Sequence, residues 1–333
     1  MSCRPAVITG VGSYVPDRVL SNADLEKIVE TNDEWIVSHT GIRERRIADD
    51  DQASSDLGLI AAQRALEDAA LSPADLDLIL VATITPDHFF PATACILQER
   101  LGAPNSTAAF DLVSGCTGFV MALAVASQFV EAGSMDNVLV ISAEKLTSIT
   151  DWTDRATCVL FGDGAGAAVV SAGDGQRGEV GIIAYALESY GEYGNLLRIP
   201  AGGSRMRVTE EVLARHDDCL RMEGPELFKL AVRGIPEIAE KVVAKAGITP
   251  ADIDWVIMHQ ANLRIIEAAA KRLHVPQDRV IVNVDRYGNT SAASMAIALD
   301  EVYREGKLKP GDNLLLVGFG AGFTLGGAVI RWQ

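Results

Sequence analysis

Three residues have side chains that could share nucleophilic catalysis, and each lies in its own short motif. Cys116 lies in Gly-Cys-Thr-Gly, His259 in His-Gln-Ala-Asn-Leu-Arg, and Asn289 in Gly-Asn-Thr-Ser. An apolar helical segment follows Cys116. Because the positive end of a helix dipole favours a thiolate, we expect a lowered pKa for this thiol. Cys116 is therefore a candidate thiol nucleophile, and His259 and Asn289 are polar residues that could join it if the fold brings the three motifs together.

Each of the three also fits a structural role when it is taken alone. A lone cysteine is commonly a small buried hydrophobe, a histidine can be bonded to backbone in the core, and Asn289 could be a helix N-cap. The five cysteines are scattered and form no CxxC pair, which favours a reducing cytoplasm over a disulfide scaffold or a zinc site. We therefore assign no catalytic role to Cys3, Cys95, Cys158 and Cys219.

Alternating strand-like and helical segments must position these residues. This alternation predicts an α/β fold with a mostly parallel, buried sheet. The expected strands are 6–9, 78–82, 108–113, 138–142, 167–170, 255–258, 280–284, 314–317 and 328–331. The expected helices are 57–70, 117–132, 225–246, 263–273 and 292–304. The charged stretch 201–218 interrupts the pattern and is expected to be an insertion or a mobile flap.

The chain repeats itself internally. The segment beginning Leu71-Ser-Pro-Ala-Asp recurs 177 residues later as Ile248-Thr-Pro-Ala-Asp, and Asp136-Asn-Val-Leu recurs as Asp312-Asn-Leu-Leu. The motifs of Cys116 and Asn289 match in the same order, which places both residues at equivalent strand-to-helix junctions. The sequence therefore predicts two duplicated halves, residues 1–175 with the cysteine and 176–333 with the histidine and asparagine.

Composition excludes several functional classes. The net charge of −16 and pI near 4.7 disfavour nucleic acid and anionic membranes as partners. The longest apolar stretch has 12 residues, whereas a membrane span needs about 20, and the N-terminus contains no apolar segment typical of a signal peptide. We expect a cytoplasmic protein.

The motifs together resemble β-ketoacyl-[acyl-carrier-protein] synthase III. Besides the three above, they are Asn-Asp-Glu-Trp-Ile-Val from residue 32, Thr-Gly-Ile-Arg-Glu-Arg from 40, Phe-Gly-Asp-Gly-Ala-Gly-Ala from 161 and Phe-Gly-Ala-Gly-Phe from 319. The resemblance covers nearly the whole chain. It implies the thiolase-like fold, five layers α-β-α-β-α built from two duplicated halves, in agreement with the repeat. It also implies decarboxylative condensation of acyl-CoA with malonyl-acyl carrier protein (malonyl-ACP), at the start of fatty acid synthesis and without a cofactor or metal.

The resemblance assigns roles within this reaction. Cys116 would accept the acyl group, while His259 and Asn289 would hydrogen-bond the malonyl thioester carbonyl and stabilise the enolate left by decarboxylation. The backbone amides of Cys116 and Ala321 would form the acyl oxyanion hole, and Phe319 would wall the malonyl carboxylate.

Substrate and partner contacts follow from the same resemblance. Trp35 and Arg155 would sandwich the adenine of CoA, with Asn262 nearby. His39 stands where many members have an arginine, so we expect weaker CoA binding, or binding that rises below about pH 6.5, where a histidine gains charge. Phe90 would cross a homodimer to close the acyl pocket, and its size favours a short primer, acetyl first.

The acyl carrier protein is itself acidic, so binding it requires a local basic patch on this acidic chain. Arg264 and Lys271 are two helical turns apart and share one face, with Arg272 beside them. Lys229 resembles a further contact. We expect these four residues to bind the carrier protein.

Two alternative functions stay open at this stage. The first is a related starter-condensing enzyme of polyketide or quinolone synthesis. The second is a Cys/His/Asn thioester hydrolase, which the duplicated sheet disfavours. Hydrolysis of a thioester without condensation would indicate the hydrolase.

Overall fold

Two five-stranded sheets with the same strand arrangement form the fold in the computed structural model, which describes residues 4–333. The first has the order β1-β7-β6-β4-β5 and the second β8-β14-β13-β11-β12, so the strands match position by position. Their bounds are β1 Ala6–Tyr14, β4 Leu78–Ala82, β5 Ala108–Leu112, β6 Asn137–Glu144, β7 Gly164–Ala172, β8 Gly181–Ser189, β11 Trp255–Met258, β12 Val280–Ile281, β13 Asn313–Gly320 and β14 Thr324–Arg331.

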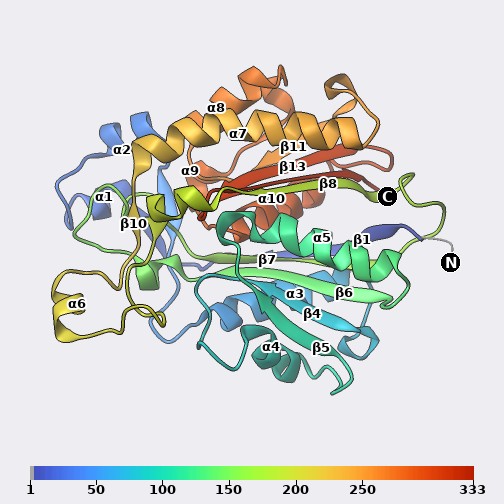
Figure 1. The fold of residues 1–333 in the computed structure, drawn as a ribbon, viewed down its shortest axis with the longest axis horizontal. Coiled ribbons are helices and arrows are strands. Elements are labelled where there is room, and N and C mark those ends of the chain that lie inside the picture. The colour runs from blue at the N-terminus through green and yellow to red at the C-terminus, as the bar shows by residue number, and fades with distance from the viewer. Residues whose placement is uncertain (1–3) are drawn as a thin grey trace.

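Helices fill the other three layers (Figure 1). Helices α5 (Gly118–Glu131) and α10 (Ala293–Arg304) lie between the sheets, where their apolar residues form the central core. Helices α3 (Ser54–Asp68) and α4 (Thr93–Leu101) cover the outer face of the first sheet. Helices α7 (Gly224–Lys245) and α8 (Leu263–Arg272) lie outside the second. The predicted five-layer α/β architecture is confirmed.

Shorter elements connect these layers. The helices are α1 Asn22–Leu25, α2 Asp33–Thr40, α6 Glu210–Ala214 and α9 Val284–Tyr287, and the strands are β2 Val19–Ser21, β3 Glu44–Arg46, β9 Leu197–Arg198 and β10 Arg221–Met222. The 3-10 helices are η1 Pro73–Asp75, η2 Gly115–Thr117, η3 Leu146–Ile149, η4 Gly191–Leu196, η5 Pro250–Asp252 and η6 Gln277–Arg279.

The repeated segments adopt the same local structure. A capping box begins η1 before β4, and another begins η5 before β11. In each, the N-cap is a hydroxyl residue, Pro comes next, and an Asp at the third helical position completes the box. Asn137 Nδ2 donates to the Asp75 carbonyl at 3.0 Å, and Asn313 Nδ2 donates to the Asp252 carbonyl at 2.8 Å. The predicted boundary at residue 175 falls in the turn between β7 and β8, and the division into two halves there stays a prediction.

Three sequence predictions about the sheets are wrong. Neither sheet is mostly parallel, because β7 and β14 each pair antiparallel on both sides. For β13 and β14 the cause is a tight turn at residues 321–323, which joins antiparallel strands directly. The expected strands omit β8, an edge strand of the second sheet whose residues are mostly buried or half-buried. The strand expected at 280–284 is only two residues long, and α9 begins at Val284.

The stretch 201–218 forms an excursion between β9 and β10 that carries α6 (Figure 1). Buried Asp151 attaches the end of this excursion to the body of the fold. His216 Nδ1 lies 3.0 Å from Asp151 Oδ1, and Arg221 donates to the other carboxylate oxygen at 3.3 Å. The segment lies outside the two large sheets, and its role as an insertion or a mobile flap stays a prediction.

Candidate active site

A cavity of about 740 Å³ brings Cys116, His259 and Asn289 together. Cys116 comes from the segment after β5, His259 from the end of β11, and Asn289 from the loop between α9 and α10. The lining also contains Phe319, Gly320 and Ala321 from the end of β13. Three motifs that are far apart in the sequence therefore share one chamber between the two sheets.

Cys116 lies in η2, immediately before helix α5. Gly115 adopts a left-handed φ of 52°, a conformation that glycine reaches without strain, and this turn leads from β5 into the helix. Burial raises the pKa of the Cys116 thiol to about 12. The expectation of a lowered pKa is wrong for the resting protein, because desolvation of the buried sulfur outweighs effects that favour the thiolate. Its proton must therefore leave as the sulfur attacks.

The backbone after β13 passes very close to Cys116. A Cβ on Gly320 would lie 2.8 Å from the Cys116 nitrogen, so only glycine permits this approach. A Cβ on Gly115 would lie 3.2 Å from the Ala321 nitrogen. The backbone segments that carry the Cys116 and Ala321 amide nitrogens are therefore packed closely together. Thr117 and Thr324 join the two segments through a 2.8 Å hydrogen bond between their hydroxyls.

His259 is held in one orientation by groups that the sequence analysis did not identify. Its Nδ1 lies 2.8 Å from Ser294 Oγ on α10, and this hydroxyl also accepts from the Gln260 N–H at 3.2 Å. Among the described residues Nδ1 is the acceptor available to the Ser294 hydroxyl proton, so we infer that Ser294 donates to Nδ1, which leaves Nε2 protonated. Burial lowers the pKa of His259 to about 3, so the ring is neutral. His259 is therefore a fixed hydrogen-bond donor at Nε2.

Gln260 fixes the backbone beside His259. It is fully buried and makes hydrogen bonds through both ends of its amide. Its nitrogen donates to the carbonyls of Met258 and Ile281, and its oxygen accepts from the N–H groups of Asn283 and Val284. The repeated sequence pattern gave no sign of Ser294 or Gln260 as supports, since both act through contacts distant in the chain.

Asn289 is oriented in a similar way. Its Oδ1 accepts from the Ser291 N–H at 2.8 Å, which leaves the amide nitrogen as its free donor. Its backbone pairs with the strand-like segment at Phe161. Phe319 packs edge-on against the His259 ring, with centroids 5.6 Å apart. The chamber therefore offers two neutral N–H donors, at His259 and Asn289, beside an apolar wall.

The predicted CoA-binding residues gather at the mouth of this cavity. Trp35 and His39 lie on α2 with their rings stacked, 4.5 Å between centroids. The Arg155 guanidinium lies 5.8 Å from the Trp35 ring centroid. Asn262 caps α8 through its Oδ1 and donates from Nδ2 to the His39 carbonyl at 3.0 Å, so it attaches α2 to α8.

The four predicted basic contacts separate into two pairs. Arg264 and Lys229 line the cavity mouth, where Arg264 lies over the Phe228 ring. Lys271 and Arg272 line a separate groove together with Glu237 and Glu240. All four are exposed. The four residues expected to form one basic patch therefore line two different surfaces.

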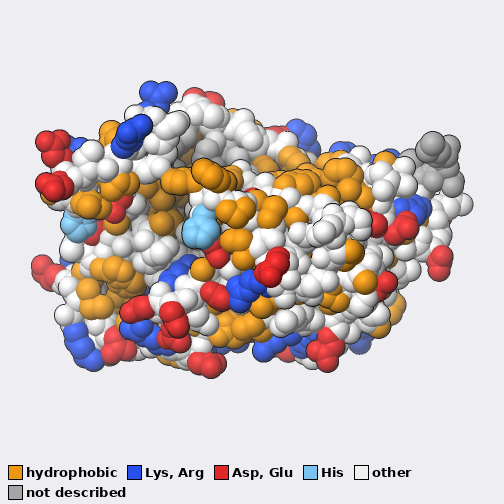
Figure 2. All heavy atoms as spheres, turned by 90° about the horizontal axis from the view of Figure 1, so that it is seen from below, with side chains coloured by type: hydrophobic (Ala, Val, Ile, Leu, Met, Phe, Trp, Pro, Cys, Tyr) orange, Lys and Arg blue, Asp and Glu red, His pale blue; other side chains and the backbone are white. Residues whose placement is uncertain are grey.

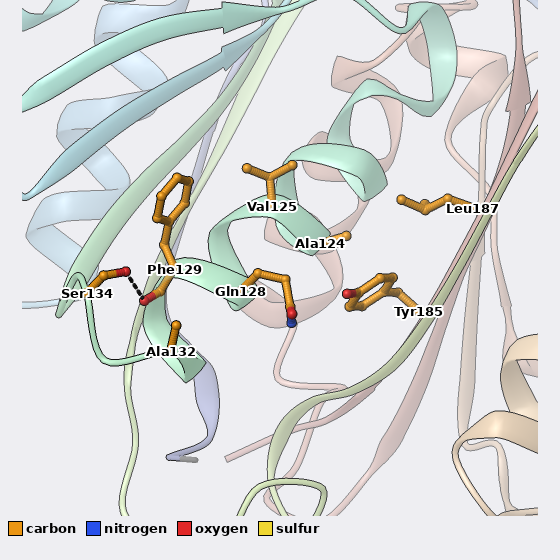
Figure 3. Close-up of a pocket in the computed structure, with 8 residues that line it drawn as sticks. All are labelled: Ala124, Val125, Gln128, Phe129, Ala132, Ser134, Tyr185 and Leu187. Carbon is orange, nitrogen blue, oxygen red and sulfur yellow. Dashed lines mark hydrogen bonds between the residues drawn. The ribbon is translucent and has the colours of Figure 1, made fainter. Parts of the chain in front are cut away.

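Phe90 does not line the cavity of its own chain. It is 85 % exposed, next to Phe89 at 83 %, and Val113 beyond the end of β5 is also strongly exposed. Figure 2 shows hydrophobic side chains gathered in a band near the upper edge of that view. Part of the apolar surface is a groove of about 450 Å³ where Val125 and Phe129 of α5 face Tyr185 and Leu187 of β8 (Figure 3).

Within residues 4–333, no helix has the length and apolarity required to cross a membrane. Within the same range, no three side chains of His, Cys, Asp or Glu cluster as a metal-binding group would. Cys3, one of the scattered cysteines, lies outside the described residues.

Comparison with known proteins places this geometry in context. Residues 110–191 match the family model 3-oxoacyl-[acyl-carrier-protein] synthase III, and residues 243–332 match the model of its C-terminal part. The chain is 56 % identical over 328 residues to a β-ketoacyl-[acyl-carrier-protein] synthase III of Caldanaerobacter subterraneus subsp. tengcongensis, covering 98 % of each. A protein of the same name from Clostridioides difficile is 49 % identical over 98 % of both chains.

Solved structures agree. The 3-oxoacyl-[acyl-carrier-protein] synthase III of Aquifex aeolicus superposes with a TM-score of 0.90 at 46 % identity, over 98 % of this chain and 100 % of that one. The priming β-ketosynthase of the R1128 polyketide pathway superposes with a TM-score of 0.91 at 36 % identity, over 100 % and 97 %.

Proposed function

The chain belongs to the β-ketoacyl-[acyl-carrier-protein] synthase III family of thiolase-like condensing acyltransferases in fatty acid synthesis, and we propose that it joins a short acyl group from acyl-CoA to malonyl-ACP through an acyl-Cys116 intermediate. The observation that carries this proposal is the meeting of Cys116, His259 and Asn289 in one cavity.

In the first half-reaction Cys116 attacks the thioester carbon of acyl-CoA. The carbonyl oxygen becomes negatively charged, and we propose that the amide nitrogens of Cys116 and Ala321, on two closely packed segments, donate to it. Donors that are already in place stabilise this charge without reorganising, typically by about 3 kcal/mol for each donor. The C–S bond to CoA then breaks, which leaves a thioester on Cys116 and releases CoA as a thiol.

In the second half-reaction malonyl-ACP loses CO₂ in the same cavity. The electrons of the broken C–C bond move onto the thioester carbonyl, whose oxygen accepts hydrogen bonds from His259 Nε2 and the Asn289 amide. A neutral histidine suits this role, since it donates without adding a positive charge that would hold the carboxylate. The apolar Phe319 ring beside His259 favours loss of the charged carboxylate as neutral CO₂.

The enolate carbon then attacks the acyl carbon on Cys116. The same two backbone amides would stabilise the new oxyanion, and the Cys116 sulfur leaves as a thiolate to give a β-ketoacyl-ACP. The thiolate then takes up one proton from solvent, which regenerates the Cys116 thiol. Because the first product departs before the second substrate reacts, the kinetics should be ping-pong.

The cavity mouth is proposed to bind CoA. Adenine would stack at Trp35 with Arg155 on its other side, at the entrance that leads to Cys116. His39 carries a ring rather than an extended cation, and its Nδ1 lies 2.8 Å from the Trp35 carbonyl. Because this contact engages Nδ1 within the helix, that nitrogen is not available to a phosphate, which supports weak phosphate binding by His39.

We propose that the carrier protein docks at the cavity mouth, mainly on Arg264 and Lys229. Malonyl-ACP must deliver its thioester through this opening, and both side chains lie beside it. Lys271 and Arg272 line a separate groove, so we propose that they contribute less to docking at the cavity mouth.

We also propose a homodimer, in which a second copy of the chain covers the exposed apolar surface. Strand β5 is an unpaired edge of the first sheet, and such edges pair readily with another strand. Val113, directly after β5, is exposed, and so are Phe89 and Phe90, so these three side chains offer apolar surface that a partner could cover. In this arrangement Phe90 would enter the partner's acyl pocket and limit the primer to acetyl or a small branched acyl group. We also propose a cytoplasmic location, which would suit an enzyme that uses acyl-CoA and malonyl-ACP.

A direct experiment tests the function. The purified protein is incubated with acetyl-, isobutyryl- and hexanoyl-CoA, and intact mass measures which acyl group is added to Cys116. Malonyl-ACP is then added. We expect an acetyl adduct that malonyl-ACP discharges as acetoacetyl-ACP; release of free acid instead would indicate the thioester hydrolase.

A further inference from the structure

One apolar cluster of the fold borders the catalytic cavity. Leu146 and Ile149 contribute to it from η3, the short helix after β6. The strand pair β9–β10 and its flanking residues contribute Leu197, Ile199, Leu220 and Met222. All six side chains also line the cavity that contains Cys116. They therefore form two walls of an apolar subsite, one from η3 and one from β9–β10, which suits the acyl chain of a primer.

The wall from β9–β10 has little structure of its own. The two strands pair through only two residues each, and the excursion 201–218 lies between them in the chain. A two-stranded ribbon this short is not stable by itself. The position of this wall therefore depends on the contacts that attach it to the rest of the fold.

Two attachments join the wall from β9–β10 to the wall from η3. The Leu220 N–H donates to the Ile149 carbonyl at 2.8 Å, so the two walls meet directly. Two residues after Ile149, the buried carboxylate of Asp151 binds the returning chain at two points. His216 Nδ1 lies 3.0 Å from Asp151 Oδ1, and the Arg221 guanidinium donates to Oδ2 at 3.3 Å. We call these two contacts of Asp151 the tether.

The tether acts from behind the wall. Alternate residues of a strand face opposite sides, and Leu220 and Met222 line the cavity whereas Arg221 between them does not. Arg221 also donates to the Arg215 carbonyl at 2.5 Å, which ties it to the excursion. The side chain that binds Asp151 thus lies between the two side chains that limit the apolar subsite.

Asp151 is fixed in place and charged. Thr153 donates to its Oδ1 from the backbone N–H at 3.0 Å and from the hydroxyl at 2.6 Å. Burial acts to raise the pKa of Asp151, but the Thr153 hydrogen bonds and the nearby His216 outweigh it and hold this pKa below its ordinary value. The carboxylate is therefore ionised at neutral pH and forms an ion pair with Arg221.

We propose that Asp151 is a positioning residue that limits the length of the primer by holding β10 against η3. With the tether in place, the apolar subsite ends at Leu220 and Met222, and a longer acyl chain collides with them. Without it, β10 can move away from η3 and the subsite lengthens. The tether's part in primer choice rests on the proposed acyl transfer to Cys116.

Competition between two primers tests this proposal. The protein is mixed with equimolar acetyl-CoA and hexanoyl-CoA, and intact mass gives the ratio of the two adducts on Cys116 at an early time. A uniform loss of active protein lowers both adducts and leaves their ratio unchanged. We expect the wild type to form almost only the acetyl adduct. In Asp151→Asn and Arg221→Ala the hexanoyl-to-acetyl ratio should rise on the order of tenfold.

Three further variants identify the tether as the cause. Arg221→Lys keeps a cation for Asp151 and should restore most of the wild-type ratio. Arg215→Ala removes an ion pair with Asp217 in the same excursion that does not reach Asp151, so the ratio should stay at the wild-type value. The double variant Asp151→Asn/Arg221→Ala should select like either single variant, because both remove the same contact.

The outcomes separate the tether from the proposed function. An unchanged ratio in Arg221→Ala would overturn the proposal, and this partly exposed residue carries the test even if Asp151→Asn fails to fold. An equal rise in Arg215→Ala would also overturn it, as would a wild type that accepts hexanoyl as readily as acetyl. If neither acyl-CoA acylated Cys116 in the wild type, the proposed function itself would fail.

Discussion

Ser294 Oγ lies 2.8 Å from Nδ1 of His259 and sets which nitrogen of the ring carries the proton. The Gln260 N–H occupies the acceptor side of this hydroxyl at 3.2 Å. His259 therefore presents an N–H to the cavity, and the decarboxylation step needs that donor. The serine lies on α10, in the central layer, so the packing of this helix helps to determine the chemistry.

Replacing Ser294 by Ala should slow malonyl-ACP decarboxylation about tenfold, because the ring can then adopt the other tautomer; tenfold corresponds to about 1.4 kcal/mol in the barrier. The rate is measured with acetyl-Cys116 enzyme already formed. Ser127→Ala is a matched control, since Ser127 is also buried in a central helix and donates only to the Ala124 carbonyl. Equal losses in both variants would argue against control of the tautomer.

The buried neutral His259 should make stability depend on pH. Its folded pKa of about 3 lies below the ordinary value of 6.5, so the unfolded chain binds more protons at low pH. This contribution to stability is fully present above about pH 6.5 and is lost progressively as the pH falls toward 3. Urea unfolding at about pH 5 and pH 7 measures it.

The matched variant for that measurement is His259→Gln, which cannot gain the charge. We expect the wild type to lose more stability than this variant between the two pH values. Glu144 and Asp163 have raised pKa values and act in the opposite direction, but they are common to both proteins and cancel in the comparison. Identical losses would contradict a buried, neutral His259.

Replacing His39 by Arg should tighten acetyl-CoA binding severalfold, because an arginine reaches phosphate oxygens with a permanent charge. Calorimetric titration with acetyl-CoA measures the change. The same titration with 3′-dephospho-CoA tests whether the gain comes from that phosphate or from those of the diphosphate. No gain with either ligand would remove the interpretation of His39 as a weakened CoA contact.

Charge reversal should separate the two pairs of basic residues. Arg264→Glu and Lys229→Glu, at the cavity mouth, are expected to raise the KM for malonyl-ACP about tenfold and to leave acylation by acetyl-CoA nearly unchanged. Lys271→Glu and Arg272→Glu should have smaller effects, because these residues line a separate groove and not the cavity mouth. Equal effects from both pairs would indicate a docking surface that extends along the whole of α8.

Much of this fold could be predicted from the sequence. The repeats beginning at Leu71 and Ile248 predict matching strands, and the polar motifs mark where the strands end. Tertiary burial could not be predicted, and it decides the Cys116 pKa against the helix dipole. The supports of the site were missed for the same reason, since Ser294 reaches His259 from 35 residues away and Gln260 binds a different segment.

The central claim is that Cys116 carries the acyl group while His259 and Asn289 serve only the malonyl half-reaction. Intact mass tests it most directly in His259→Ala and Asn289→Ala, by timing acetylation of Cys116 and then its discharge by malonyl-ACP. The account predicts acetylation close to the wild-type rate and discharge slower by 10² to 10³-fold, roughly the loss of one oxyanion donor. Wild-type discharge in either variant, or acetylation that falls as far as discharge, would contradict it.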